Sequence, residues 1–446
     1  MVQIMAVTPQ AAVTAKGPFT MVGSASAHNR DISRSFRIRT ALLGIASLLL
    51  AAVSFAAAGG TALANGSPDL ALRLAPGNPA ALVAKADAIM LAAPVTGAAD
   101  ASALATAAAR AQPLNPRALR ILGYAADLKG RLGQAARLIA LSTRMSRRDV
   151  GAQLWLIEYS VRVGDVDGAL AHYDLALSTG TSSTNLLYQT LTNALAEPAV
   201  RRGLVRYLAR RRPWLEDFLG YAIAHSAQPS AIGKLIVESP GFLADPAHAE
   251  LGKRLVERSI SDGDALTAQL VYLAAPEHTR ARLISPSFAS RDRDWADGAV
   301  GWRLLETPDG AALLIAGGGG DGLQMHLQGA SDTLAKLAQR TLFLTPNSYV
   351  FGVQIRSTTF SNGGFVRFRL HCADFGDMRE LWSREVVQPG KLRVQFTVDS
   401  RCAMQVLEVE MAGGDGSQGS TADIGSPLIV VDGGRHSGSE GAAGQH

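Results

Sequence analysis

Residues 115–180 read NPRALRILGYAADLKGRLGQAARLIALSTRMSRRDVGAQLWLIEYSVRVGDVDGALAHYDLALSTG. Four positions of this stretch recur 34 residues later: Leu122 as Leu156, Gly130 as Gly164, Ala135 as Ala169 and Ile139 as Tyr173. Apolar residues at helical spacing lie on both sides of each central glycine, and glycine relieves backbone strain where a chain reverses. The stretch therefore predicts two consecutive helical hairpins, with small residues such as Gly123 where the helices cross.

This pattern resembles the tetratricopeptide repeat, which has the same period. The resemblance implies an all-α solenoid of stacked hairpins that binds partner proteins. Two features depart from the family: Leu119 and Gln153 stand where it places an aromatic residue, and the prolines that it places at repeat ends are mostly absent. The alternative is two unrelated antiparallel helix pairs, and four coincident positions at one period weigh against it.

The chain has 446 residues, a length that predicts two or three domains. Residues 1–40 are polar, and we expect them to be a disordered cytoplasmic N-terminus. Residues 41–58 form an uncharged apolar run, just long enough to span a bilayer as a helix. Four arginines precede the run and no basic residue follows it closely. The positive-inside rule therefore places the rest of the chain outside the cytoplasm.

Two interpretations of this run remain open. It predicts an uncleaved single-pass anchor in the inner membrane, with the chain after about residue 60 in the periplasm. Alternatively, Ala62-Leu63-Ala64 is a small-x-small cleavage pattern, and the segment is a signal sequence that releases a secreted or periplasmic protein. A buried soluble helix is disfavoured because it would carry polar positions.

Residues 66–183 are predicted to hold the repeats, since Asn78-Pro79 aligns with Asn115-Pro116. Residues 184–280 keep helical spacing but lose the period, so we expect degenerate repeats there. Arg202, Arg206 and Arg210 lie one turn apart on one helix face. They indicate either a patch for an anionic partner, such as acidic polysaccharide or lipid head groups, or an ordinary solvated face. Nucleic acid is not an expected partner of an exported segment.

Residues 283–432 alternate between apolar and polar residues, as in Leu392–Val398 and Leu407–Met411. This period of two predicts strands with one buried face, and glycine turns such as Asn362-Gly363 separate them. The fold class is therefore a multidomain chain with a transmembrane helix, a helical-repeat solenoid and a C-terminal all-β antiparallel sandwich. Residues 433–446 are rich in glycine and serine and are expected to be a disordered tail.

The predicted sandwich resembles the jelly-roll carbohydrate-binding modules. The features that carry the resemblance are Ser287-Phe288, Gly301-Trp302-Arg303-Leu304, Leu344-Thr345-Pro346 and a closing strand at Leu428–Val431. Sugar rings stack on aromatic faces, and indole offers the largest area. We expect Trp302 in the core, and Trp295 and Trp382 as an exposed ligand-binding pair; otherwise the pair covers the ends of the sandwich.

Two cysteines, Cys372 and Cys402, allow one disulfide. Outside the cytoplasm such a bond would persist, so we expect it to form rather than leave two buried thiols.

Other patterns in the sequence are incomplete. Gly317, Gly319 and Gly322 fit a dinucleotide-binding spacing, but an alternating segment follows them instead of a helix, so we expect a hairpin. Residues 292–298 miss a calcium-loop spacing by one residue. Glu408 and Glu410 share a strand face, which we expect to be solvated. We therefore expect no cofactor, metal or catalytic residue.

These observations favour a non-enzymatic envelope scaffold or assembly protein. It would bind proteins through its helical repeats and could act in cell-surface polysaccharide export, with the sandwich binding polysaccharide. The alternative is a carbohydrate-active enzyme whose site lies on the sandwich.

Overall fold

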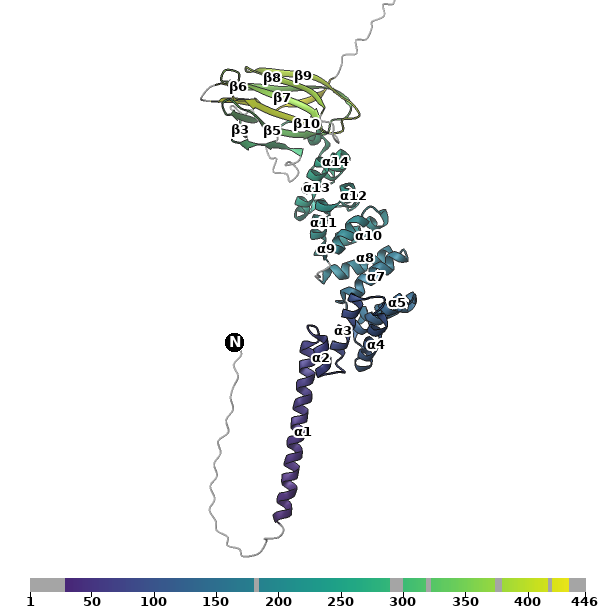
Figure 1. Ribbon diagram of the computed structural model, residues 1–446. Helices are drawn as coiled ribbons and strands as arrows, with labels where there is room; N and C mark the ends of the chain where they lie inside the picture. The colour runs from purple at the N-terminus through teal and green to yellow at the C-terminus, as the bar shows by residue number, and fades with distance from the viewer. Residues whose placement is uncertain are drawn as a thin grey trace, which may run out of the picture. The chain divides into compact units, whose positions relative to one another are not determined.

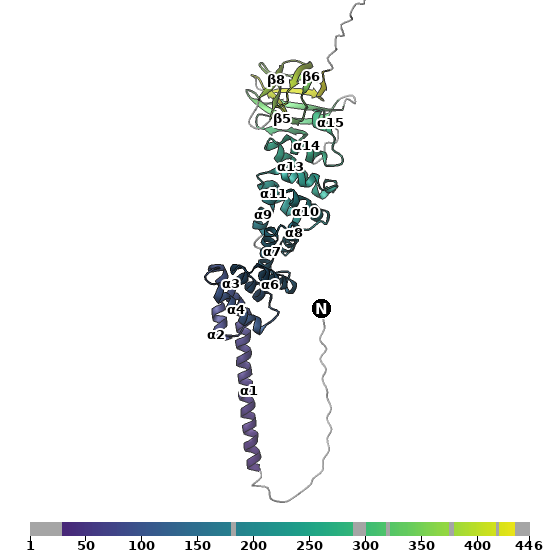
Figure 2. The same ribbon diagram turned by 90° about the vertical axis from the view of Figure 1, so that its right-hand side faces the viewer.

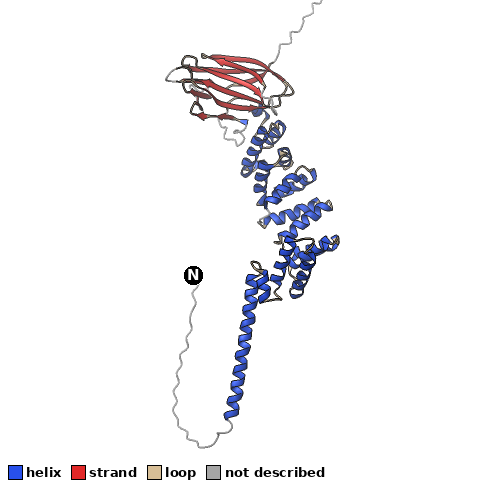
Figure 3. Ribbon diagram, in the orientation of Figure 1, coloured by secondary structure: helices blue, strands red, loops and turns tan. Residues whose placement is uncertain are grey.

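The computed structural model describes residues 29–179, 184–288, 300–317, 322–373, 379–415 and 419–432. Within these ranges, fifteen α-helices are followed by two antiparallel sheets (Figure 3). Contacts between residues divide the chain into two units, residues 1–145 and 146–446. The boundary falls between the two predicted 34-residue copies.

The first unit is helical. Its helices are α1 (Asn29–Leu63), α2 (Pro68–Leu74), α3 (Pro79–Ala92), α4 (Ala98–Ala111), α5 (Pro116–Leu128) and α6 (Leu132–Met145). Helix α1 is continuous over 35 residues (Figure 1). Residues 29–40, which we predicted to be disordered, therefore belong to a helix. The segment Leu42–Leu63 is long and apolar enough to cross a membrane, with a mean hydropathy of 2.2, so it extends beyond the predicted residues 41–58.

Polar side chains mark where helices α3, α5 and α7, each the first of a hairpin, begin. Asn78 and Asn115 precede a proline and accept hydrogen bonds from backbone N–H groups of the first turn, as an N-cap does. Asp149 does the same for the first helix of the second unit. Gly123 of α5 faces Ile139 of α6 so closely that a Cβ there would lie 2.4 Å from Ile139 Cγ1. The predicted close crossing of these helices is therefore present.

The second unit begins with helices that contact one another in two series. They are α7 (Val150–Arg162), α8 (Val166–Ser178), α9 (Thr184–Ala194), α10 (Pro198–Ala209), α11 (Trp214–His225), α12 (Pro229–Val237), α13 (Ala249–Ser261), α14 (Ala265–Leu273) and α15 (Arg280–Ile284), with 3₁₀ turns at Phe242–Ala244 and Pro246–His248. Helix α8 contacts α10, α10 contacts α12 and α12 contacts α14, while α9 contacts α11 and α11 contacts α13. Each series buries one side of a shared apolar core that includes Phe218 and Leu255.

The turns of the hairpins share one backbone pattern. Gly130, Gly164 and Gly263 all have a positive φ, between 72° and 77°. The N–H after each glycine donates to a carbonyl five residues earlier, for example from Asp165 to Ser160 at 2.8 Å and from Asp264 to Ser259 at 2.8 Å. This is the bond pattern of a Schellman motif, in which a left-handed glycine ends a helix. The backbone therefore requires glycine at these turns, including Gly130 and Gly164, which we predicted there.

The sandwich consists of two sheets packed face to face. Its strands are β1 (Trp302–Leu304), β2 (Glu306–Thr307), β3 (Gly310–Ala316), β4 (Leu323–Gly329), β5 (Leu334–Leu342), β6 (Asn347–Thr359), β7 (Phe365–Cys372), β8 (Glu380–Val386), β9 (Gly390–Val398), β10 (Gln405–Ala412), β11 (Ser420–Gly425) and β12 (Leu428–Val431). One sheet has the order β1-β5-β10-β7-β8, and the other β12-β6-β11-β4-β3-β2 with β9 paired to β6. Alternate residues of both sheets fill the core, around Phe351 and Phe368.

The helices of the second unit join the sandwich through α15, which lies against β5 (Figure 2). The N–H of Phe343 donates to the carbonyl of Leu283 at 3.0 Å. The side chains of Phe343 and Met404 are buried in the helical core rather than in the sandwich core. The sandwich, predicted to begin at residue 283, therefore follows a helix that ends at Ile284, and its first described strand begins at Trp302.

Candidate functional site on the β-sandwich

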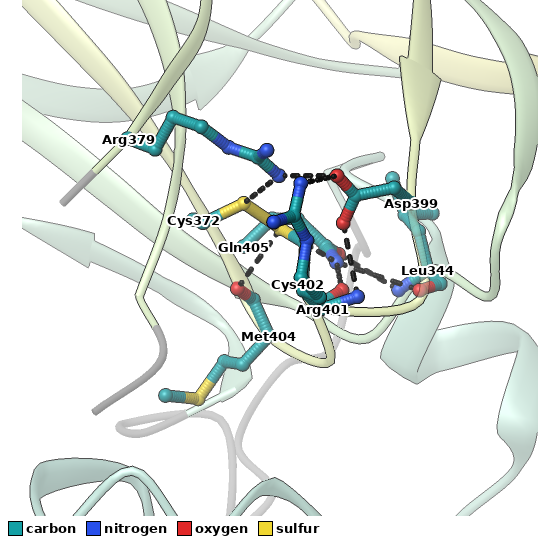
Figure 4. The surroundings of a disulfide bond; sticks show 8 residues. All are labelled: Leu344, Cys372, Arg379, Asp399, Arg401, Cys402, Met404 and Gln405. Carbon is teal, nitrogen blue, oxygen red and sulfur yellow. Dashed lines mark hydrogen bonds and ion pairs between the residues drawn. A yellow bond between two sulfur atoms is a disulfide. The ribbon is translucent and has the colours of Figure 1, made fainter. Parts of the chain in front are cut away.

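The predicted disulfide between Cys372 and Cys402 is present, with a Cα–Cα distance of 5.5 Å. It joins the end of β7 to the turn before β10, and Figure 4 shows the polar side chains around it. Arg379 lies 3.7 Å from Cys372 Sγ and pairs with Asp399 at 2.9 Å. The hydrogen bond from Arg379 lowers the pKa of the Asp399 carboxyl. The disulfide therefore lies at one end of the sandwich, beside polar side chains that are paired with one another.

Gln405 completes this end of the sandwich. Its amide group donates to the carbonyl of Cys402 at 2.6 Å and accepts from the N–H of Leu344 at 2.8 Å (Figure 4). These bonds satisfy buried backbone groups that would otherwise be costly. We assign the disulfide and its surroundings to stability rather than to ligand binding.

Trp382, predicted to be one of an exposed pair, is buried with only 6% of its surface exposed. It lies opposite Leu370 in the register of β7 and β8, and its ring centroid is 4.9 Å from that of Phe351. An indole enclosed in this way cannot stack on a sugar, so the expectation for Trp382 is wrong. Trp295, the other member of the predicted pair, lies outside the described residues. Trp302 is partly buried against the sandwich core, and its Nε1–H donates to the carbonyl of Pro286 at 2.7 Å.

The outer face of the five-stranded sheet carries a connected set of charged side chains. Glu408 and Glu410 of β10 point outward, as predicted from their alternation. Lys336 of β5 donates to Glu408 at 3.0 Å. On the other side, Arg367 of β7 donates to Glu410 at 3.1 Å and to Glu385 of β8 at 2.6 Å.

The same network continues along β7. Arg369 lies 3.2 Å from Glu380 and 3.6 Å from Glu410, and His371 lies 3.7 Å from Glu408. Glu408 and His371 are 8% and 5% exposed. This face was predicted to be solvated, and the ion pairs explain why these side chains are instead shielded.

Burial is the largest influence on His371 and lowers the pKa of its imidazole. The carboxylate of Glu408 raises this pKa, whereas Arg369 and Lys336 lower it. The sheet thus disfavours the protonated imidazole even though the carboxylates of Glu408 and Glu380 lie nearby. Lys336 and Arg369 keep part of their side chains exposed, so N–H donors at this face can still reach a hydroxyl-rich ligand.

Arg202, Arg206 and Arg210 lie on an exposed face at α10, in agreement with their helical spacing. Arg206 forms an ion pair with Asp167 of α8. The neighbouring arginines are also engaged, because Arg211 pairs with Asp245 and Arg212 pairs with Asp174. One of the three arginines of the predicted anionic-partner patch, Arg206, and the adjacent Arg211 and Arg212 thus have their charges paired within the protein, which weakens the patch as a binding site.

Sequence reasoning missed Lys336, Arg367, Arg369 and His371 as members of one polar face. Arg367 and Arg369 alternate on one strand as Glu408 and Glu410 do on another. This alternation could have revealed the polar face only if the strand register, which places Glu410 opposite Arg367, had been known.

A search of protein-family models finds no match, and a search of curated proteins also finds none. Among solved structures, the C-terminal sandwich resembles carbohydrate-binding modules. TmCBM61 in complex with β-1,4-galactotriose is 14% identical, with 29% of this chain and 88% of that chain covered and a TM-score of 0.22. The C-terminal family 22 module of Clostridium thermocellum Xyn10B is 17% identical, with 33% and 93% covered and a TM-score of 0.24. At such TM-scores the likeness carries no argument about function.

Proposed function

We propose that this protein is a non-enzymatic scaffold of the bacterial cell envelope. An uncleaved helix would anchor it in the inner membrane. The helical part and the sandwich would act in the periplasm, where they would bind a partner protein and a polysaccharide during cell-surface polysaccharide export.

The observation that carries the anchor is the way α1 ends. Its apolar segment is exposed along most of Leu42–Leu63, as expected of a helix that contacts lipid. Its last turn instead packs on the helices that follow. Ala64 is 1% exposed against Ala71 and Ala81, and Asn78 donates to Thr61 at 3.1 Å. Leu63 is thus partly buried and Ala64 is buried against the helices that follow, while Ala62 is exposed, and this packing favours an anchor over a cleaved signal sequence.

The disulfide supports the proposed position of the sandwich on the periplasmic side of the membrane. A bond between Cys372 and Cys402 persists in an oxidising compartment and is rare in the cytoplasm. This agrees with the arginines that precede the apolar segment.

The proposed protein partner rests on the two series of helix contacts in the second unit. Contacts between alternate helices, from α8 to α14 and from α9 to α13, are typical of a solenoid. Solenoids present extended surfaces to partner proteins. The proposed polysaccharide partner rests on the polar outer face of the five-stranded sheet.

The proposal is tested in bacterial cells that express the chain. We expect the mature protein to retain its N-terminus and to remain in the membrane fraction after a carbonate wash. A phosphatase that is active only in the periplasm, fused after Asp432, should be active. A mature chain that begins near residue 65, or an inactive fusion, would contradict the anchor or its orientation.

The binding part of the proposal is tested by crosslinking in intact cells, followed by purification of the chain and analysis of both proteins and glycans. We expect one class of envelope protein and one polysaccharide to be enriched over a control chain that consists of α1 alone. Enrichment of neither would refute the scaffold role.

A further inference from the structure

A cleft of about 580 Å³ opens where the C-terminal turn of α13 meets the outer face of β1 and β5. Glu257, Ile260 and Ser261 of α13 line one wall. Arg303 of β1 and the side chains of Gln339 and Thr341 of β5 line the other. The volume lies within the usual range for sites that bind small ligands.

The two walls of the cleft are held together by shared structure. Besides the bond from Phe343 to Leu283, Arg340 of β5 donates to the carbonyl of Arg282 at 3.2 Å. The side chains of Phe343 and Met404 enter the helical core. A ligand would therefore meet a largely preformed site, which reduces the entropy lost on binding.

The lining offers both donors and acceptors. Arg303 supplies a planar fork of N–H donors, Glu257 supplies carboxylate acceptors, and Gln339 supplies one group of each kind. Glu257 and Arg303 are exposed, and among the described residues neither forms an ion pair. Both are thus available to a ligand, and their opposite charges leave the lining with no net charge.

We propose that this cleft binds a neutral oligosaccharide segment, with Arg303 and Glu257 each spanning adjacent hydroxyl groups. The inference rests on the proposed function and assigns its polysaccharide site. An acidic sugar would gain from Arg303 but be repelled by Glu257. A peptide fits less well, because Ile260 is the one large apolar side chain in the described lining, and sites for peptide side chains are mostly apolar.

The register of the sheet extends the site beyond the cleft. Arg303 lies opposite Gln339, Gln339 lies opposite Glu408, and Glu408 lies opposite Arg369. Neighbouring strands are about 4.8 Å apart, so this row places a polar side chain at regular steps across the sheet. Glu408 is shielded, but Gln339 and Arg369 are partly exposed, so a linear saccharide bound in the cleft can contact these two members of the row, which favours a chain over a single sugar.

The test uses the full-length chain in detergent micelles and isothermal titration with defined probes. The neutral probes are β-1,4-galactotriose, xylohexaose and cellohexaose, and the acidic probe is trigalacturonate. We expect at least one neutral probe to bind, and binding by Arg303→Ala and by Glu257→Ala to be weaker by about tenfold each, the loss typical of one charge-assisted hydrogen bond. Ser261→Trp, which fills the cleft from an exposed position, should abolish binding.

Matched controls separate the cleft from general effects of charge. Arg393→Ala removes an exposed arginine of β9 on the other sheet, and Glu250→Ala removes an exposed glutamate of α13, and neither residue lines the cleft. Both should bind as the unmodified chain does, and a circular dichroism melt should show that all variants fold.

The outcomes distinguish the two proposals. If a neutral probe binds but Arg303→Ala, Glu257→Ala and Ser261→Trp leave its affinity unchanged, the cleft proposal is overturned while polysaccharide binding stands. If only trigalacturonate binds, the neutral class is wrong. If no probe binds, both the cleft proposal and the polysaccharide part of the proposed function are refuted for these sugars.

Discussion

The helices and the sandwich of the second unit differ in how far apart in sequence the residues are that close their structure. In the helical part, each hairpin closes through a turn within a few residues, as the bonds from Asp165 to Ser160 and from Asp264 to Ser259 show. In the sandwich, β10 takes its place between β5 and β7, which come much earlier in the chain. A helical hairpin can therefore form from local sequence, whereas the sandwich must close long loops first.

The difference explains why the covalent bond lies in the sandwich. A cross-link restricts the unfolded chain most where the native contacts are far apart in sequence. The helical part has no cysteine, and its hairpins are stabilised by glycine turns and N-caps instead.

Removal of the disulfide should produce the largest of the three effects. The double variant Cys372→Ser, Cys402→Ser should lose about 3 kcal/mol of stability in the sandwich, because the bond closes a segment with a sequence separation of 30 residues. Hydrogen exchange measured by mass spectrometry should show less protection in β5, β7 and β10. Protection in α9–α12 should not change, and an equal loss there would show that the two regions unfold as one.

A smaller effect is expected from Gly123→Ala in the α5–α6 hairpin. The new methyl group would overlap Ile139 and force the two helices apart, at a cost of about 1–3 kcal/mol. Gly133→Ala is the matched control, since Gly133 of α6 faces open space. It should be neutral or slightly stabilising, because alanine is the better helix former. Chemical denaturation of the full-length chain measures the unfolding free energy of both variants. Equal destabilisation by the two substitutions would contradict the close crossing of α5 and α6.

The smallest effect should be a pH dependence from His371. Its folded-state pKa lies below the ordinary value of 6.5, so between these two values the unfolded chain binds more protons than the folded one. The resulting stability is present above pH 6.5 and is lost as the pH falls through the folded-state pKa.

His371→Gln should therefore flatten the decline in sandwich stability on acidification. His225→Gln, at an exposed position of α11, should leave that decline unchanged. The slope of unfolding free energy against pH for the two variants is the measurement. A steeper decline in His371→Gln would show that the sign is wrong.

The sequence predicted the features that depend on nearby residues. Gly130 and Gly164 were placed at turns, and the strand alternation of Leu407–Met411 was recognised, because each pattern is complete within a few residues. The pairing of Cys372 with Cys402 could be predicted because the chain has only two cysteines.

The features that depend on register could not be predicted. Strand alternation places Trp382 and Arg384 on the same face of β8, yet Arg384 is exposed. The pattern within β8 therefore does not decide which face is buried. An irregularity between Leu370 and His371 further shifts the pairing with β7. The ion pair of Arg206 with Asp167 likewise arises from helix packing, which places side chains 39 residues apart in contact.

The disulfide also sets how far the sandwich could be stretched under tension. A pulling force on the two ends of a domain lengthens it as strands detach, by roughly 3.3–3.6 Å for each residue released. The residues between Cys372 and Cys402 cannot contribute to that lengthening, because the bond carries the load past them. With the bond intact, the released contour length should be shorter by roughly 100 Å than after reduction. A protein held in a membrane at one end and bound to a polymer at the other would thus have a built-in limit to its extension.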